Sequence, residues 1–400
     1  MRTDLGFRLD PDWTFLNHGS FGACPAPVIE AQAAWRDRLE RQPVRFLDRE
    51  LPGLLVEVRD RLGAFLHADP DGLVFVPNAT TGVNAVMRSL AFESGDEILT
   101  TDHEYNAVIN TLHAVADPAG ATVRLAHIPV PVTDAAAVAE VVVGAIGERT
   151  RLLVISHVTS PTALVLPIER IVAAARARGV DTLVDGAHAP GMIPLDLDAL
   201  GAAYYTGNAH KWLCAPKGAG FLWVRPDHRD GVLPTVTSHG ANDQRPDVPA
   251  LRKRFDWVGT IDPTATLSIP AALDAVAALD PDGWPGVMAA SHARAIDAGG
   301  VLAAALEVEP LAPVSMLGAM VAVSLPWLRT DVEALRCKEQ LEAERIEVPL
   351  VGVPVRAARS DPNADPTLVV VRASTPPYVE REDIERLAEV LRRIRPEAGA

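Results

Sequence analysis

The sequence predicts an α/β protein, with a large domain built on a mostly parallel sheet and a smaller C-terminal α+β domain. Short apolar runs alternate with helical patterns between residues 73 and 224, as in sheets whose strands are linked by helices. Polar clusters follow several of these runs, where ligands bind in such sheets. The 400 residues exceed the usual size of one core. We expect an N-terminal arm at residues 1–27, the large domain at 28–265 and the small domain at 266–400.

The elements of the large domain are predicted in chain order. Residues 27–66 have an arginine-rich helical pattern that Pro43 and Pro52-Gly53 interrupt. Strands are predicted at residues 73–77, 97–101, 123–128, 182–185 and 220–224, and the continuous apolar run at residues 151–158 predicts a buried strand. Helices are expected from the patterns at residues 78–87, 135–146 and 168–178, and another begins near residue 102.

The C-terminal part of the chain has a different pattern. Residues 232–263 lack regular periodicity, and a loop of this length in a compact enzyme is usually functional or part of an interface. The elements expected after it are a long helix at 269–306, a strand at 321–325, a helix at 332–345, a strand at 367–372 and a last helix at 381–394.

Composition excludes several classes of function. The net charge of −15 repels phosphate backbones, so we expect no nucleic-acid partner. Cys24, Cys214 and Cys337 have neither disulfide-framework nor metal-ligand spacing, so we expect no metal site. The polar N-terminus does not resemble a signal peptide, and no apolar run is long enough to span a membrane. We therefore expect a cytoplasmic protein.

The most informative stretch is Tyr204 to Leu213, in which Lys211 lies between a histidine and a tryptophan. Burial of a lysine is costly unless its pKa falls, and a lowered pKa is what a lysine that forms a Schiff base needs. For an isolated lysine, a surface position with its stem on Trp212 is the commoner outcome. The preceding strand changes this balance, because it ends in Asp185 with His188 three residues later.

A second informative stretch is residues 78–87, which are small and hydroxylic at first and then helical. Free N–H groups at a helix N-terminus, together with threonine hydroxyls, form a natural phosphate cradle. An ordinary helix cap would have the same residues. The chain has neither GxGxxG nor GxxxxGK[ST], so the sequence indicates neither dinucleotide nor P-loop binding.

Eight motifs follow one another along the chain: Asn17-His18-Gly19-Ser20-Phe21-Gly22, Asn78-Ala79-Thr80-Thr81, Asp102-His103-Glu104-Tyr105, Ser156-His157-Val158, Val184-Asp185-Gly186-Ala187-His188-Ala189-Pro190-Gly191, His210-Lys211-Trp212, Gly259-Thr260 and Val371-Arg372-Ala373-Ser374. In this order they resemble the pyridoxal-phosphate-dependent aminotransferases of class V, over nearly the whole chain. Within that family, the chain most resembles the isopenicillin N epimerase-like group. The resemblance implies fold type I, with pyridoxal 5′-phosphate bound in the large domain.

The resemblance also implies roles for individual residues. Lys211 is the lysine that carries the cofactor and moves the Cα proton. Asp185 is the partner of the ring nitrogen, and His188 bonds the ring 3′-oxygen. Tyr105 takes the place of the ring-stacking aromatic, with His103 as the weaker alternative. The phosphate cradle is assigned to Ala79, Thr80 and Thr81, with His210 and Asn208 beside it.

Three further sets of residues complete the implied site. Gly259-Thr260 resembles the loop that reaches the phosphate of the neighbouring subunit, which implies a homodimer with shared active sites. Arg372 matches the arginine that binds the substrate carboxylate, and Asn17 and Ser20 are candidate substrate groups. Ser160 stands near the 3′-oxygen, where desulfurases have an asparagine. Viewed in isolation, Asp185 could cap a helix and Arg372 could pair with a surface acid.

The motifs are compatible with more than one reaction at the Cα of the substrate. Our leading hypothesis is epimerase or aminotransferase chemistry on an amino acid, and the alternatives are a C–S lyase on a cysteine derivative or a non-catalytic protein on the same fold. Persulfide-forming desulfuration is disfavoured, because residues 346–366 lack the nucleophilic cysteine of desulfurases. An epimerase needs a second acid or base facing Lys211, for which Tyr105, His239 or a water could serve. His157 lies in an apolar strand and is expected to be a core histidine.

Overall fold

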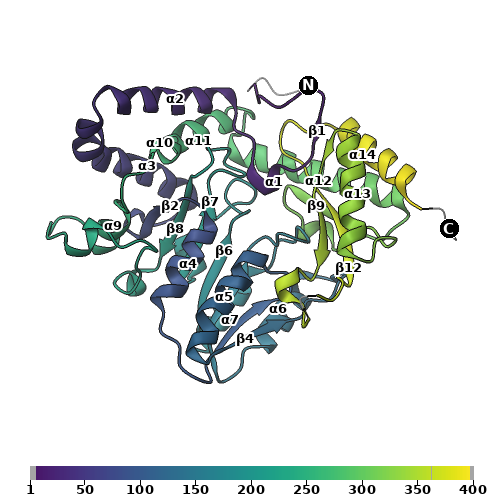
Figure 1. The fold of residues 1–400 in the computed structure, drawn as a ribbon, viewed down its shortest axis with the longest axis horizontal. Helices are drawn as coiled ribbons and strands as arrows, with labels where there is room; N and C mark the ends of the chain where they lie inside the picture. The colour runs from purple at the N-terminus through teal and green to yellow at the C-terminus, as the bar shows by residue number, and fades with distance from the viewer. Residues whose placement is uncertain (1–5, 362, 397–400) are drawn as a thin grey trace.

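The computed structural model describes residues 6–361 and 363–396, and a seven-stranded sheet forms the centre of its large domain (Figure 1). The outermost residues of the predicted arm and of the predicted C-terminal domain, 1–5 and 397–400, and also residue 362, lie outside this part. In spatial order the strands are β2 Leu73–Val76, β8 Gly220–Val224, β7 Tyr204–Asn208, β6 Asp181–Gly186, β5 Thr150–Ser156, β3 Glu97–Thr101 and β4 Thr122–Ala126. Only β8 runs antiparallel to its neighbours. The mostly parallel α/β sheet is confirmed.

Both faces of this sheet are buried, which explains the continuous apolar runs. Along β5, Leu152 and Val154 belong to the core on one face, whereas Leu153 and Ile155 belong to the core on the other. Helices α4 Ala79–Ser89 and α5 Asn106–Ala119 cover the first face, and α6 Ala135–Gly144 and α7 Ile168–Ala177 cover the second. The short helix α8 Leu197–Leu200 precedes β7.

The arginine-rich N-terminal region forms α2 Ala26–Arg41, a π-helical turn Arg45–Glu50 and α3 Leu51–Leu66. The predicted interruption at Pro43 is confirmed, but the one at Pro52-Gly53 is wrong. Pro52 lies in the first turn of α3, where a residue without an N–H removes no helical hydrogen bond. Further along the chain, the region expected to be irregular contains the short helix α9 Ala250–Phe255 and is followed by α10 Thr264–Leu267.

The small domain is a three-stranded antiparallel sheet with helices packed on it. The sheet order is β11 Leu350–Val353, β12 Leu368–Ser374 and β9 Met320–Ser324, and the helices are α13 Asp331–Ala343 and α14 Arg381–Ile394. The expected long helix is two helices, α11 Ile269–Ala277 and α12 Trp284–Leu306, because Gly283 takes a left-handed φ of +64° before the second begins. Short 3₁₀ turns are found at Pro70–Gly72, Pro226–His228, His239–Asn242, Val314–Met316 and Arg356–Ala358.

The N-terminal arm lies between the two domains (Figure 1). Its strand β1 Thr14–Phe15 pairs in parallel with β10 Ile346–Glu347, and α1 His18–Phe21 follows. Leu16 is fully buried in the core of the small domain. In the part of the chain that the structure describes, no helix combines the length and apolarity needed to cross a membrane.

Candidate active site

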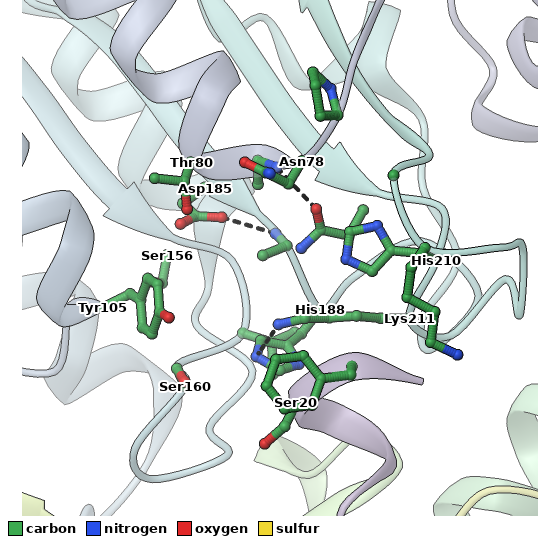
Figure 2. A pocket seen from close by; sticks show the side chains of 18 residues that line it. Ser20, Asn78, Thr80, Tyr105, Ser156, Ser160, Asp185, His188, His210 and Lys211 are labelled. Atoms are coloured by element: carbon green, nitrogen blue, oxygen red, sulfur yellow. Dashed lines mark hydrogen bonds between the residues drawn. The ribbon is translucent and has the colours of Figure 1, made fainter. Parts of the chain in front are cut away.

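A cavity of about 340 Å³ opens at the C-terminal ends of β5, β6 and β7, next to α1 (Figure 2). Most of the predicted site residues line it: Ser20, Ala79, Thr80, Tyr105, Ser160, Asp185, His188, Asn208, His210 and Lys211. The topology brings them together because parallel neighbouring strands end at the same edge of the sheet. Four predicted residues do not line it, namely Asn17, Thr81, Thr260 and Arg372.

Lys211 and His188 form the centre of the cavity. The Lys211 Nζ lies 3.2 Å from Nε2 of His188, whose Nδ1 accepts a long bond of 3.5 Å from the Trp212 indole N–H. This places the imidazole hydrogen on Nε2, directed at the amine. Burial, assisted by the positive charge of Arg372, lowers the Lys211 pKa to about 7, and burial lowers the His188 pKa well below its usual value. The lysine is thus a neutral amine for much of the time near neutral pH.

Asp185 is the buried carboxylate of the cavity. It lies at the end of β6, where one of its oxygens accepts a bond of 2.8 Å from the Ala187 N–H. Burial raises the pKa of Asp185, while the hydrogen bond from Ala187 and the charge of Lys211 oppose that rise. Among the ion pairs of the described residues, none involves Asp185. It is therefore available to a cationic group of a ligand.

The N-terminus of α4 forms another wall of the cavity. Asn78 caps this helix by accepting from the Thr81 N–H at 2.9 Å and from the Thr81 hydroxyl at 3.1 Å. Asn208 accepts from the Ala79 N–H at 2.8 Å. Within the described residues, this leaves the Thr80 N–H of the first turn without an acceptor, and Thr80 lines the cavity. A Cβ at Gly82, one turn along, would overlap the Thr206 hydroxyl.

His210 lies beside this helix end. Its Nδ1 donates to the carbonyl of Ala219 at 2.9 Å, which leaves Nε2 free of that bond. Burial lowers the His210 pKa to about 4. The cavity wall near it also contains Lys217 and Gly218, which the sequence did not single out.

Arg372, on β12 of the small domain, lies directly behind two serines of the cavity wall. Its Nη1 donates to the Ser160 carbonyl at 2.5 Å and to the Ser160 hydroxyl at 3.2 Å, and its Nη2 donates to the Ser20 hydroxyl at 3.3 Å. Its side chain is 3% exposed, and Nε has no partner. Within the described residues, no carboxylate pairs with it. Burial lowers the Arg372 pKa to about 10, so the guanidinium remains charged.

The remaining predicted residues have other surroundings. Asn17 uses both ends of its amide, donating to Glu347 at 2.9 Å and accepting from Ser20 at 2.5 Å. Tyr105, 44% exposed, precedes α5 at the mouth of the cavity. Thr260 is exposed and away from the cavity of its own chain. His239 also lies elsewhere, in a groove between α3 and α9.

Sequence reasoning missed the buried acid Glu104. One of its oxygens accepts from the Ser156 hydroxyl at 2.5 Å and from the Tyr105 N–H at 2.8 Å. Burial, reinforced by the charge of Asp185, raises the Glu104 pKa to about 8. A glutamate beside a helix start is ordinarily exposed, and nothing in the local pattern signals this burial.

Two histidines of the motifs have structural positions. His18 joins the arm to the lysine segment: Nε2 donates to the Lys211 carbonyl at 3.0 Å, and Nδ1 accepts from the Ala23 N–H at 3.1 Å and lies 2.8 Å from the Tyr378 hydroxyl. Burial lowers the His18 pKa to about 3. His157 is a core histidine, as expected, 3.0 Å from the Tyr205 hydroxyl.

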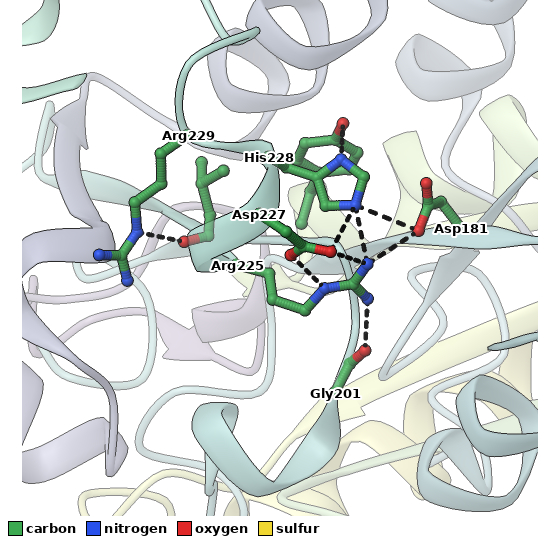
Figure 3. Close-up of polar contacts among 8 residues, drawn as sticks. Asp181, Gly201, Arg225, Asp227, His228 and Arg229 are labelled. Carbon is green, nitrogen blue, oxygen red and sulfur yellow. Dashed lines mark hydrogen bonds and ion pairs between the residues drawn. The ribbon is translucent and has the colours of Figure 1, made fainter. Parts of the chain in front are cut away.

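The opposite edge of the sheet carries a different polar cluster (Figure 3). Arg225, just after β8, donates to Asp227 at 2.7 Å, to Asp181 at 3.2 Å and to the Gly201 carbonyl at 3.0 Å. His228 accepts from the same guanidinium at 2.7 Å. Each charge in this cluster has a partner of opposite charge, which Arg372 lacks among the described residues, so the cluster ties the strand ends together.

Comparisons with known proteins agree with this geometry. The family model described as aminotransferase class V matches residues 41–279. The isopenicillin N epimerase of Amycolatopsis lactamdurans is 38% identical, with 96% of each chain covered. The chain belongs to the class V aminotransferase family.

Other relatives have different activities. A probable chloroplastic L-cysteine desulfhydrase of Arabidopsis thaliana is 31% identical, with 96% of this chain and 83% of that protein covered. The solved cystine C–S lyase C-DES, in complex with its product cysteine persulfide, matches with a TM-score of 0.77 and 26% identity over 96% of this chain and 99% of that one. A variant of C-DES with glycine covalently linked to its PLP cofactor matches with a TM-score of 0.80 and 26% identity, over 96% and 97%. This member of the class V family is a pyridoxal-phosphate-dependent enzyme of fold type I.

Proposed function

We propose that this protein acts at the Cα of an amino acid with a free α-carboxylate, and that its main reaction is epimerisation, as in the isopenicillin N epimerases it resembles. The observation that carries the proposal is the buried guanidinium of Arg372, which has no carboxylate partner among the described residues and lies behind a cavity that contains the amine of Lys211. An uncompensated buried charge is costly unless a ligand supplies the opposite charge. An amino acid brings a carboxylate for Arg372.

The residues of the cavity fit the cofactor. Pyridoxal phosphate supplies an aldehyde for an amine and a ring that withdraws electrons from Cα. The neutral amine of Lys211 would hold it, since only the unprotonated amine is nucleophilic. Asp185 would keep the proton on the ring nitrogen, and His188, with its hydrogen on Nε2, would donate to the 3′-oxygen.

The phosphate would bind at the N-terminus of α4. Thr80 offers a free N–H and a hydroxyl, and Ala79 and His210 line the same wall. Asn208 and Thr81 are engaged with the backbone of Ala79 and with Asn78, so we assign them to holding the helix end in shape.

Tyr105 and Ser160 would complete the site. The ring of Tyr105 would stack on the cofactor ring, and Ser160 would hold Arg372 through the bonds already described. Figure 2 shows Tyr105 and Lys211 on opposite sides of the cavity. This arrangement favours epimerisation, because Lys211 can take the proton from one side of Cα while the Tyr105 hydroxyl, or a water that it orients, returns one from the other.

A C–S lyase acting on a cysteine derivative is the second candidate, favoured by the similarity to the desulfhydrase and to the cystine lyase. That reaction needs Lys211 and a sulfur leaving group, and no second acid. Persulfide transfer to the protein is disfavoured, since Cys24, Cys214 and Cys337 are absent from the cavity wall.

Proton NMR in deuterated water tests these alternatives. The cofactor-loaded protein is incubated with single amino acids, cysteine derivatives and isopenicillin N, with Lys211→Ala as the blank. Loss of the Cα proton signal with appearance of the opposite configuration supports epimerisation, and Tyr105→Phe should then keep the exchange but slow the inversion. A keto acid released together with sulfide or a thiol means a lyase. If Lys211→Ala left the biological output of the protein unchanged, the non-catalytic alternative would be supported.

We also propose a homodimer in which Thr260 of one subunit reaches the cofactor phosphate of the other. The exposed positions of Thr260, of Ile261 at 56% and of Phe21 at 70%, which also lines the cavity, support this. Sedimentation of the wild-type protein should give a dimer, and a Thr260→Ala variant should bind the cofactor less tightly. The cytoplasmic location and the domain boundaries stay predictions from the sequence.

A further inference from the structure

A chain of hydrogen bonds connects Arg372 to an acid that neither the motifs nor the reaction draws on. Glu347 accepts from Asn17 Nδ2 at 2.9 Å, and Asn17 Oδ1 accepts from the Ser20 hydroxyl at 2.5 Å. Ser20 in turn accepts from Arg372 Nη2 at 3.3 Å. The chain therefore runs from β10 of the small domain, through α1 of the arm, to β12.

The direction of every bond in this chain follows from its first member. An ionised carboxylate can only accept, so Asn17 must turn its amide nitrogen toward Glu347. Its oxygen then faces Ser20, and the serine proton points at that oxygen. The lone pairs of the serine are left for the guanidinium. Reversing the first bond would turn the Asn17 amide nitrogen toward Ser20. The serine oxygen would then accept from Asn17 as well as from Arg372, so the two donors would compete for its lone pairs.

The backbone holds the first member in place. Glu347 is paired with Phe15 across β1 and β10, and its carbonyl accepts from the Leu16 N–H at 2.9 Å. Asn17 follows directly and is buried. Because the amide is shielded, water competes weakly for its two bonds, and the orientation of the amide is determined by its protein partners.

The bonds that hold Arg372 leave one of its nitrogen atoms without a protein partner. Nη1 is occupied by Ser160, and one Nη2 hydrogen is directed at Ser20. Nε has no protein partner, and it shares an edge of the guanidinium with Nη2, which has two hydrogens. A carboxylate accepts two parallel bonds from such an edge.

We propose that Glu347 and Asn17 are positioning residues for the carboxylate site: they bind the proton of the Ser20 hydroxyl and leave its lone pairs to Arg372, whose Nε hydrogen has no protein partner and is left for the substrate carboxylate. This inference rests on the proposed role of Arg372. It gives Asn17 a task different from substrate contact, because both ends of its amide are already engaged. It also makes docking of the arm on the small domain a condition for tight carboxylate binding.

The test uses glycine and glycine methyl ester as probes of the cofactor-loaded protein. Glycine has the amine and the carboxylate but no stereocentre and no leaving group, so its binding does not depend on whether the enzyme is an epimerase or a lyase. The ester has the amine without the negative charge. Both are titrated while the cofactor absorbance is followed, and the ratio of the two dissociation constants reports the carboxylate site alone.

Three variants test the direction of the hydrogen bonds that connect Glu347 to Arg372. Glu347→Gln can still present an oxygen to Asn17, so we expect its ratio to stay within about twofold of wild type. Glu347→Lys reverses the first bond and should weaken glycine, but not the ester, by about tenfold, the size of one net hydrogen bond. Adding Asn17→Asp to Glu347→Lys supplies an acceptor at both ends of the side chain, and this double variant should recover most of the glycine affinity. Glu339→Lys, on the exposed surface of α13, is the charge-matched control.

The outcomes separate this inference from the proposed function. Equal weakening of glycine and ester in Glu347→Lys, no weakening of either, or failure of the double variant to recover would overturn the positioning role. If Glu347→Lys unfolds, as a thermal melt would reveal, Asn17→Ala replaces it, with an expected loss of about twofold to tenfold in the ratio. Arg372→Lys tests the underlying role separately: a wild-type ratio in that variant refutes the carboxylate site itself.

Discussion

Replacing Arg372 by lysine keeps the positive charge at the carboxylate site but removes the pair of parallel N–H donors that can bind a carboxylate in a bidentate manner. In the wild type, Nη1 is committed to Ser160, so the substrate is left with the Nε and Nη2 hydrogens. Each hydrogen bond to a charged group contributes about 1.5–3 kcal/mol. Lysine can provide one such bond in place of two. The expected loss in kcat/KM is therefore about 1.5–3 kcal/mol, or roughly 10- to 150-fold.

The assay is the rate of Cα proton exchange in deuterated water, measured for the best amino acid and for its methyl ester. The loss should be confined to the free acid, because the ester offers no charged acceptor to the guanidinium. Arg372→Met, which lacks both bonds and the charge, should lose about 3–6 kcal/mol. A loss below twofold in Arg372→Lys, or an equal loss for acid and ester, would refute the reasoning.

Three further predictions concern the cofactor cradle and the lysine. Thr80→Val should weaken cofactor binding by about twofold to tenfold, whereas Thr81→Val, whose hydroxyl serves the cap, should leave the dissociation constant nearly unchanged, as measured by fluorescence titration of the cofactor-free protein. Gly82→Ala would overlap the neighbouring hydroxyl of β7 and should cost about 1–3 kcal/mol in urea unfolding, while Gly300→Ala, with open space around it in α12, should gain up to about 1 kcal/mol; equal effects would contradict the packing. The lowered pKa of Lys211 means that the unfolded chain binds more protons between about pH 7 and 10.5. The stability that Lys211→Met adds to the cofactor-free protein should therefore be full below about pH 7, decrease as the pH rises and vanish above pH 10.5, which pH-dependent unfolding would check.

The sequence predicted those parts of the site whose signals are local. Asp185 follows a predicted strand, so the topology rule for parallel sheets placed it where ligands bind. Lys211 was found from its apolar flanks and its motif, because β7 was not among the predicted strands. The helix start at Asn78 was equally readable, because a capping residue precedes a hydroxylic first turn. In the same way, the interruption near Pro43 followed from backbone geometry alone.

The parts that were missed depend on tertiary contacts. Glu104 and Glu347 have the sequence pattern of exposed acids, and only the packing of the sheet and of the arm buries or engages them. The helix break at Gly283 and the short strand β11 were not predicted, because neither changes the periodicity of the hydrophobic residues enough to be recognised in the sequence. That Arg372 has no carboxylate partner among the described residues is a property of three-dimensional surroundings that no motif records.

The central claim is that Lys211 holds the cofactor in the cavity whose wall Arg372 supports through Ser20 and Ser160. Reduction of the cofactor-loaded protein with borohydride, followed by proteolysis and mass spectrometry, tests it most directly. We expect the cofactor on the peptide that contains Lys211, and its complete loss from that peptide when excess glycine is added before reduction, because the amino acid takes the place of the lysine amine. Modification of Lys217, the other lysine of the cavity wall, would contradict the account, as would labelling that persists in Lys211→Ala.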